Sequence, residues 1–156
     1  MDTKRYREAI SHFATGVTII TTMKDGKPVG MTASAVASLS LEPILLLVCI
    51  SNKIATHEAI EHSQKFVVNV LGEGDGELAM RFAMPVADRF AGLELRTEFE
   101  LPVIKSAIAH FVCDVHERFP GGDHSIFIGQ VVDCSFEPDS RPLLYFKSKF
   151  GSLGSA

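Results

Sequence analysis

Two long apolar stretches in the C-terminal half constrain the fold more than any other feature. Residues 107–119 and 124–136 both have the composition of β-strands, and they are joined by the turn-forming residues Pro120, Gly121, Gly122 and Asp123. A connection this short makes the two strands antiparallel, because parallel strands need a crossover of roughly a dozen residues or more. The sequence therefore predicts a sheet built around a long β-hairpin.

The rest of the chain adds further strands and only a few short helices. Strand-like runs lie at 17–23, from 29 onward, at 44–50, at 66–71 and at 142–146. The spacing of apolar residues predicts helices at 6–13, 54–62 and 77–83. This order lacks the regular strand–helix alternation of a parallel sheet. Because closure removes exposed strand edges, we predict a mainly β fold, an antiparallel β-barrel with short peripheral helices.

Composition limits the size, the partners and the compartment of the protein. Its 156 residues are most simply one domain spanning 1–156, with enough apolar residues for a sizeable core. The net charge of -4 and the scattered basic residues argue against a nucleic-acid surface.

The cysteines at 49, 113 and 134 form no CxxC pair, which is typical of a reduced compartment. The longest apolar run, 43–50, is far shorter than the roughly 20 residues that span a bilayer, and the N-terminus lacks a signal-peptide core. We expect a soluble cytoplasmic protein.

Three patterns come close to known functional motifs. Residues 72–76 do not complete the dinucleotide-binding pattern GxGxxG, because Glu77 stands at its last position. His57 and His62 differ from a zinc-binding HExxH pair by one residue, so about 140° separates them around a helix and we reject a zinc site. Serine, histidine and aspartate all occur, but no serine lies in a GxSxG elbow. A hydrolase triad stays open, although no pattern favours it.

Short polar stretches interrupt the apolar strands and predict a ligand site. Residues 31–40 carry small hydroxyls and an accessible backbone, which suit a flat ligand with a polar edge, such as a flavin. Residues 51–57 combine hydroxyls with a lysine at the start of a predicted helix, where free N–H groups favour a phosphate. A simple helix cap with an exposed lysine is the alternative. Residues 121–125 place a histidine in a tight turn between two strands. Together these stretches indicate a bound redox cofactor.

A series of motifs then extends over almost the whole chain. They are Phe13–Thr22, Gly30–Ser34, Ser38–Pro43, Thr56–His57, Phe66–Leu71, Arg81–Ala83, Asp88–Gly92, Gly122–His124, Gly129–Val131, Pro142–Phe146 and Phe150–Gly151. In this order they resemble the short-chain flavin reductases, the reductase components of two-component flavin monooxygenases. The resemblance implies the FMN-binding split-barrel fold of that family.

The resemblance also implies a role for each of a set of residues. Those implied to line the edge of the flavin ring are Thr32, Ala33 and Ser34. Those implied to hold the ribityl chain and phosphate are Cys49, Ser51, Lys53 and Thr56. Those implied to complete the flavin site are Phe82, Ala83 and Arg89. Those implied to meet the nicotinamide cofactor are Ser38, His124, Tyr145 and Phe150.

The implied activity is hydride transfer from C4 of a nicotinamide cofactor to N5 of FMN or FAD. The cofactors carry this chemistry, so we expect His124 to position the nicotinamide and not to act as a general acid. No arginine pair marks a pocket for a 2′-phosphate, which favours NADH over NADPH. The family implies a homodimer with cofactor sites near the subunit interface, and reduced flavin that serves a separate oxygenase.

Two other functions would explain part of the sequence, and two features of the sequence depart from the family pattern. A non-enzymatic split-barrel module that binds flavin or haem would keep the polar stretches but would not need the Gly122–His124 turn. A plain structural barrel explains neither polar stretch. Gln130 stands where the family often has an acid, so the nicotinamide side can differ in detail. The segment between Ala83 and Asp88 is short, which leaves open how the distal end of the flavin is selected.

Overall fold

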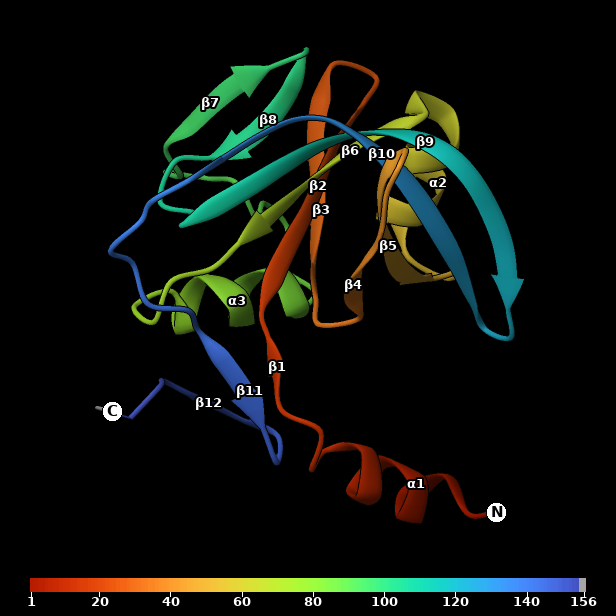
Figure 1. Ribbon diagram of the computed structural model, residues 1–156, viewed down its shortest axis with the longest axis vertical. Coiled ribbons are helices and arrows are strands. Elements are labelled where there is room, and N and C mark those ends of the chain that lie inside the picture. The colour runs from red at the N-terminus through yellow and green to blue at the C-terminus, as the bar shows by residue number, and fades with distance from the viewer. Residues whose placement is uncertain (155–156) are drawn as a thin grey trace.

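The central element is one antiparallel sheet of seven strands in the order β3-β2-β6-β9-β10-β5-β4 (Figure 1). The structure is a computed structural model that describes residues 1–154. The strands of the sheet are β2 (Thr18–Lys24), β3 (Lys27–Ala33), β4 (Val36–Leu41), β5 (Ile44–Ser51), β6 (Lys65–Val70), β9 (Ala109–Gly121) and β10 (His124–Phe136). The prediction of a mainly β fold with antiparallel pairing is confirmed.

The long hairpin predicted from the sequence is formed by β9 and β10. Both strands have 13 residues, and Gly121 pairs with His124 at the closed end. The turn is tighter than the sequence indicated, because only Gly122 and Asp123 lie outside the strands. Gly122 has φ of 72°, in the left-handed region that glycine adopts without steric cost. The hairpin is long and curved, and its closed end extends past the rest of the sheet (Figure 1).

Closure of the sheet into a barrel is not confirmed. Within residues 1–154 no hydrogen-bonded ladder joins the two outer strands, β3 and β4. The sequence indicated one return strand from residue 29 through the hydroxyl-rich stretch, but the strand breaks at Ser34 and Ala35. The carbonyl of Ala35 accepts a hydrogen bond from the amide of Cys49 (3.0 Å), which directs the chain onto β5. The strand that follows, β4, therefore pairs with β5, and the outer edge of β3 has no strand partner among the described residues.

Three helices and two small sheets surround the main sheet. The helices are α1 (Thr3–Ile10), α2 (Ala55–Ser63) and α3 (Gly76–Ala83). Helix α1 begins earlier than predicted because Asp2 caps it, accepting a hydrogen bond from the amide of Lys4 (3.1 Å). The small sheets, which the sequence analysis mostly missed, comprise β7 (Leu95–Glu98) with β8 (Leu101–Ile104), and β1 (Thr15–Gly16) with β11 (Leu144–Phe146) and β12 (Lys149–Gly151). Among residues 1–154, no helix has the length and apolar character needed to cross a membrane.

The core lies on both faces of the sheet, because successive strand residues point to opposite sides. Ile20 belongs to a cluster that includes Ile60 of α2, whereas Ile19 belongs to a cluster that includes Phe82 of α3. The sheet is tightly packed where β10 passes β6 and β9. A Cβ atom at Gly129 would lie 2.6 Å from the ring of Phe66, so only glycine fits there. Each face of the sheet is therefore packed against a helix, α2 on one side and α3 on the other.

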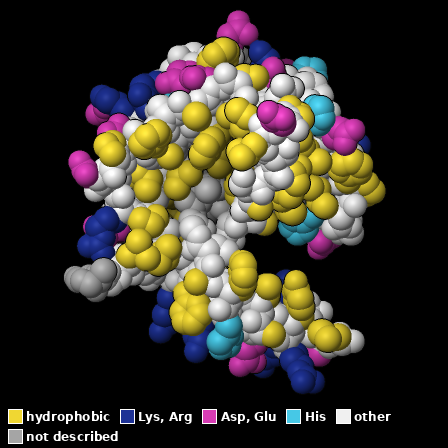
Figure 2. All heavy atoms as spheres, in the orientation of Figure 1, with side chains coloured by type: hydrophobic (Ala, Val, Ile, Leu, Met, Phe, Trp, Pro, Cys, Tyr) yellow, Lys and Arg dark blue, Asp and Glu magenta, His cyan; other side chains and the backbone are white. Residues whose placement is uncertain are grey.

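The two ends of the chain form a separate lobe beside the sheet. Thr15 of β1 pairs with Tyr145 of β11, and the amide of Lys147 donates to the carbonyl of Ser11 (2.8 Å). Figure 1 shows α1, β1, β11 and β12 standing away from the main sheet. Figure 2 shows a hollow between these four elements and the main sheet. None of the residues of α1 is buried. We call α1, β1, β11 and β12 the terminal lobe.

Candidate active site

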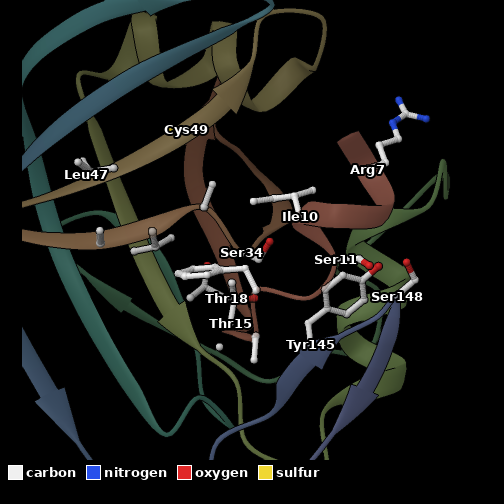
Figure 3. Close-up of a pocket in the computed structure, with 16 residues that line it drawn as sticks. Arg7, Ile10, Ser11, Thr15, Thr18, Ser34, Leu47, Cys49, Tyr145 and Ser148 are labelled. Carbon is white, nitrogen blue, oxygen red and sulfur yellow. The ribbon is translucent and has the colours of Figure 1, made fainter. Parts of the chain in front are cut away.

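A cleft of about 890 Å³ lies between the main sheet and the terminal lobe (Figure 3). Ser34, Leu47 and Cys49 line it from the sheet, and Ile10 and Tyr145 line it from the lobe. Its volume lies within the range of about 300–1,000 Å³ that is typical of small-molecule sites. The walls are largely apolar, with a few polar groups between them. This combination suits a flat, mostly apolar ligand with a polar edge.

One polar group in this cleft has no partner within the protein. The hydroxyl oxygen of Thr15 is buried and makes no hydrogen bond among the described residues. An unpaired buried polar atom costs about 1–3 kcal/mol, so a ligand that bonds to Thr15 gains that hydrogen bond. The residues present therefore fit a flavin, whose ring edge carries both acceptors and a donor. Thr15 was not among the site residues predicted from the sequence, although Thr15 lies in the Phe13–Thr22 motif.

The three residues expected at the flavin ring edge have different surroundings. Ser34 is exposed and lines the cleft. The hydroxyl of Thr32 instead donates to the carbonyl of Ala79 in α3 (2.5 Å). Ala33 is buried in the core, and its carbonyl accepts from the hydroxyl of Thr18 (2.7 Å). Strand alternation separates the side chains of Thr32 and Ala33, so the sequence stretch does not present one continuous polar edge.

The residues expected to hold the ribityl chain and phosphate extend from the cleft to the start of α2. Cys49 lines the cleft, and Ser51 ends the same strand. Lys53 is exposed in the following loop, and its amide donates to the hydroxyl of Ser51 (3.5 Å). Thr56 is buried in the first turn of α2. The residue before this helix is Ile54, which has no side-chain acceptor to cap it; the amide of His57 bonds to the carbonyl of Ile54, and the amides of Ala55 and Thr56 stay available to an anion.

The residues expected to complete the flavin site form a frame around α3. Phe82 is buried and packs edge-to-face against Phe90, with ring centroids 4.9 Å apart. The guanidinium of Arg89 donates to the carbonyls of Met84 (2.9 Å) and Gly30 (3.0 Å), which attaches the loop after α3 to β3. Ala83 is exposed. These contacts give Phe82 and Arg89 clear structural roles, and neither residue lines the cleft.

The aromatic residues expected on the nicotinamide side lie between two hollows. Tyr145 lines the cleft, whereas Phe150 lines a second groove of about 640 Å³ together with Met80 and Met84. The rings of Tyr145 and Phe150 are in contact, with centroids 5.6 Å apart. Ser38 is exposed on the outer strand β4, opposite Leu46, and does not line the cleft. The four expected nicotinamide residues are therefore not gathered in one place within this single chain.

His124, the fourth of these residues, is the first residue of β10, directly opposite Ser51 at the end of β5. Its side chain is 44% exposed, and its Nδ1 lies 2.7 Å from a carboxylate oxygen of Asp123. The hydrogen bond from the His124 ring, and then the charge of that ring, lower the pKa of Asp123. Asp123 is therefore ionised near neutral pH and accepts the Nδ1 proton, which leaves Nε2 of His124 free for a ligand.

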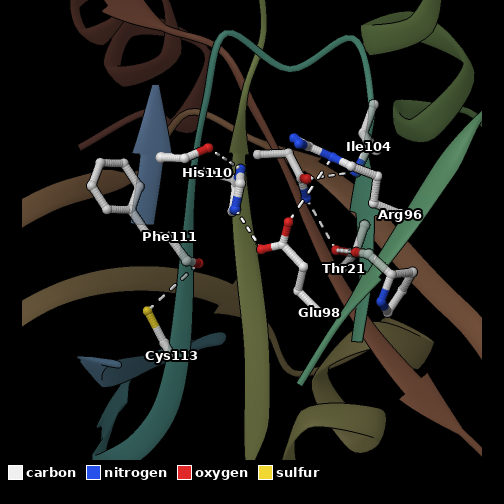
Figure 4. A network of polar contacts seen from close by, with 10 residues as sticks. Thr21, Arg96, Glu98, Ile104, His110, Phe111 and Cys113 are labelled. Atoms are coloured by element: carbon white, nitrogen blue, oxygen red, sulfur yellow. Dashed lines mark hydrogen bonds and ion pairs between the residues drawn. The ribbon is translucent and has the colours of Figure 1, made fainter. Parts of the chain in front are cut away.

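A second polar network lies at the β7–β8 hairpin and has a structural role (Figure 4). A carboxylate oxygen of Glu98 lies 2.7 Å from Nε2 of the buried His110. The side-chain oxygen of Asn69 accepts from the amide of Ile104 (2.8 Å), and the hydroxyl of Thr21 donates to the carbonyl of Pro102 (2.5 Å). These contacts attach the β7–β8 hairpin to the main sheet. None of these residues lines the cleft.

The flavin reductase like domain family matches residues 10–154, and the chain belongs to this family. It is 40% identical over 151 residues to the reductase component of 4-nitrophenol 4-monooxygenase/4-nitrocatechol 2-monooxygenase of Rhodococcus opacus, covering 97% of this chain and 81% of that protein. A flavin reductase solved in its native state has a TM-score of 0.94 and 40% identity, covering 99% of this chain and 100% of its own. The NADH:FAD oxidoreductase of Streptomyces globisporus, solved with NAD and FAD fragments, has a TM-score of 0.93 and 32% identity, covering 98% of this chain and 93% of its own.

Proposed function

We propose that this protein is an NAD(P)H:flavin oxidoreductase that reduces FMN or FAD and supplies the reduced flavin to a separate monooxygenase. The observation that carries the proposal is the cleft between the sheet and the terminal lobe, where the buried hydroxyl of Thr15 lacks a partner among the described residues. A flavin held in this cleft would supply the acceptor for a hydride that a nicotinamide cofactor donates. The relatives named as reductase components and as an NADH:FAD oxidoreductase support this proposal and do not favour a non-enzymatic module.

The chain supplies binding and orientation for that chemistry. Leu47 and Tyr145 provide apolar walls that exclude water, and Thr15 and Ser34 provide hydroxyls for the polar edge of a flavin. The uncapped first turn of α2 and the cation of Lys53 provide the site for its phosphate. Holding two reactants in a fixed relation lowers the entropic part of the barrier, so these contacts contribute to rate as well as to affinity.

We also propose that the fold is a split barrel, that NADH is the hydride donor and that the protein is cytoplasmic. The TM-scores to solved flavin reductases, 0.94 and 0.93, support the description of the fold as a split barrel. The relative that is named for NADH supports NADH as the hydride donor. Cys49, Cys113 and Cys134 are all free thiols, which fits a reducing cytoplasm. FMN and FAD both remain candidates for the flavin.

The proposal is tested by the oxidation of NADH by purified protein, with no flavin, with FMN and with FAD. We expect turnover that saturates as flavin is added, and the flavin with the higher kcat/KM is the preferred substrate. NADPH in place of NADH identifies the nicotinamide preference. A protein that carries a flavin or haem spectrum but oxidises neither cofactor is the binding module instead.

The terminal lobe supports the proposal of a homodimer. The apolar side chains of Tyr6, Ile10 and Phe13 lie at helical spacing, and all three are exposed in the single chain. Phe13, the last of them, is 71% exposed. An apolar surface of this kind on a soluble chain marks an interface, and a second copy would cover it next to the cleft.

Replacing Phe13 with aspartate should weaken the homodimer, because a charge at an apolar interface is desolvated without a partner. Light scattering after size exclusion should give the wild type about twice the chain mass of 17.0 kDa, and the variant a smaller mass at low concentration. Glu8→Lys, which changes charge on the opposite side of α1, serves as the control. A wild type that is monomeric at all concentrations would contradict the dimer.

The three cysteines report where the flavin binds. Cys134 is exposed, Cys49 lines the cleft, and Cys113 is buried. Burial, together with the charge of Asp114, raises the pKa of Cys113 to about 12. Because the thiolate is the reactive form, iodoacetamide at pH 8 should label Cys134 quickly and leave Cys113 unmodified in the folded protein.

Added FMN or FAD should slow the labelling of Cys49 and leave the labelling of Cys134 unchanged, as measured by peptide mass spectrometry. Equal labelling of Cys49 with and without flavin would place the flavin elsewhere.

A further inference from the structure

Asn52, in the loop before α2, bonds to the turn at the end of the β9–β10 hairpin, beside the ladder that pairs His124 with Ser51. Its backbone amide donates to the carbonyl of Asp123 (3.0 Å), and its side-chain nitrogen lies 3.4 Å from the carbonyl of Gly122. Its side-chain oxygen accepts from the hydroxyl of Ser125 (2.9 Å). Asn52 therefore contacts the residues on both sides of His124. The proposed function places the flavin phosphate at this loop, and the family resemblance implies that His124 in this turn meets the nicotinamide.

The network continues from Ser125 into α2. The hydroxyl of Ser125, which is buried, lies 2.8 Å from Nε2 of His57, and Nδ1 of His57 lies 3.5 Å from a carboxylate oxygen of Glu61. Glu61 also pairs with Arg118 of β9. The hairpin is thus attached to α2 at two points, one on each of its strands.

The direction of the hydrogen bonds in this network follows from the available protons. The side-chain oxygen of Asn52 has no proton, so the hydroxyl of Ser125 donates its only proton there. Nε2 of His57 must then carry a proton and donate to Ser125. Burial, and then the charge of Arg118, lower the pKa of His57, which favours the neutral ring. With the proton on Nε2, Nδ1 has none to donate, so its 3.5 Å approach to Glu61 is not a hydrogen bond. A histidine that donates to a serine does not activate that serine as a nucleophile. The Ser125, His57 and Glu61 arrangement is therefore not a hydrolase triad.

Of the two connected segments, the hairpin turn has fewer attachments besides this network, namely the ladder that pairs His124 with Ser51 and Ser125 with Ile50, and the pairing of β9 with β10. The loop at 52–54 is held between β5 and α2, which both pack into the core. The outer part of β9, from Glu117 to Gly121, pairs only with β10 and is exposed. Loss of a contact in the network should therefore loosen the part of the turn beyond the β5–β10 ladder, including Asp123 which holds the His124 ring, and leave the loop in place.

We infer that Asn52, Ser125 and His57 are positioning residues that hold the His124 turn at a fixed place relative to the loop before α2. This inference rests on the proposed function, which places the flavin phosphate at the loop, and on the nicotinamide role that the family resemblance implies for His124. Its consequence is that the network contributes to the use of NADH without touching either cofactor.

Replacing Ser125 with alanine tests the inference, because it removes the central hydroxyl and leaves Asn52 and His57 without their partner. We expect the KM for NADH to rise roughly three- to tenfold, the range that one neutral hydrogen bond supplies. The Kd for flavin should stay within about twofold of the wild type. Ser125→Thr keeps the hydroxyl on a residue that favours strands, so it should restore most of the wild-type KM. Asn52→Ala should raise the KM for NADH in the same direction as Ser125→Ala.

A matched control lies at the other end of the same strand. The hydroxyl of Ser135 lies 3.2 Å from Nδ1 of His110, so Ser135→Ala also removes a serine–histidine contact from β10. It should leave the KM for NADH unchanged. If Ser125→Ala lowers the melting temperature but leaves the KM for NADH equal to that of Ser135→Ala, the role is structural and the inference is wrong. If the wild type itself does not oxidise NADH in the presence of flavin, the proposed function fails instead.

Discussion

Replacing His124 with alanine should raise the KM for NADH about tenfold or more, with the Kd for flavin within about twofold of the wild type. Nδ1 of His124 lies 2.7 Å from the carboxylate of Asp123, which leaves Nε2 available to a ligand. In the neutral ring this nitrogen can accept from the amide of a nicotinamide carboxamide. Loss of a well-positioned hydrogen bond of this kind costs about 1.4 kcal/mol, which corresponds to a factor of about ten.

Asp123→Asn keeps His124 in the chain and changes only the side chain that holds its ring, so it tests whether the orientation of that ring matters. The amide keeps the size of the side chain but removes the charge that holds the Nδ1 proton, so an intermediate increase in the KM for NADH is expected. Steady-state kinetics at saturating flavin give the KM, and quenching of flavin fluorescence gives the Kd. An unchanged KM for NADH in His124→Ala would remove His124 from the nicotinamide site.

Replacing Ser34 with tyrosine should reduce the affinity for flavin about a hundredfold or more. Ser34 lies between β3 and β4, is exposed and lines the cleft, so a larger side chain is expected to enter the cleft without disturbing the core. The ring would occupy volume that the flavin needs. A hundredfold loss corresponds to about 2.7 kcal/mol, within the cost of about 1–3 kcal/mol for overfilling a packed space.

The measurement is a flavin titration of the variant by fluorescence quenching or calorimetry, with the melting temperature as a check of the fold. Ser140→Tyr is the matched control, since Ser140 is exposed in the loop before β11 and lines neither hollow. It should bind flavin as the wild type does. Wild-type flavin affinity in Ser34→Tyr would contradict the placement of the flavin in this cleft.

The features that the sequence predicted well are those set by local composition. The hairpin of β9 and β10 was predicted because two long apolar runs flank a turn that contains Gly122. Helix α3 was predicted to within one residue, because its apolar positions recur at helical spacing. The family was identified from the order of its motifs, and the match over residues 10–154 confirms it.

The features that the sequence did not predict depend on contacts between distant segments. The break of the polar stretch at Ser34 and Ala35 follows from the bond between Ala35 and Cys49, which lies on β5, the second strand after the break. Ser34 therefore reaches the cleft, whereas Thr32 bonds to α3. The unpaired state of Thr15 depends on how the terminal lobe folds back beside the sheet. Neither feature has a local signature in the sequence.

The most direct test of the account is anaerobic reduction of flavin by NADH in the presence of the protein, followed by the loss of the flavin's visible absorbance. We expect this absorbance to be lost much faster with protein than without it. We also expect a slower loss when NADH carries deuterium at the transferred position of C4, because the hydride passes directly between the two cofactors. Flavin that stays oxidised, or that is reduced no faster than in protein-free solution, would contradict the assignment of this chain as a flavin reductase.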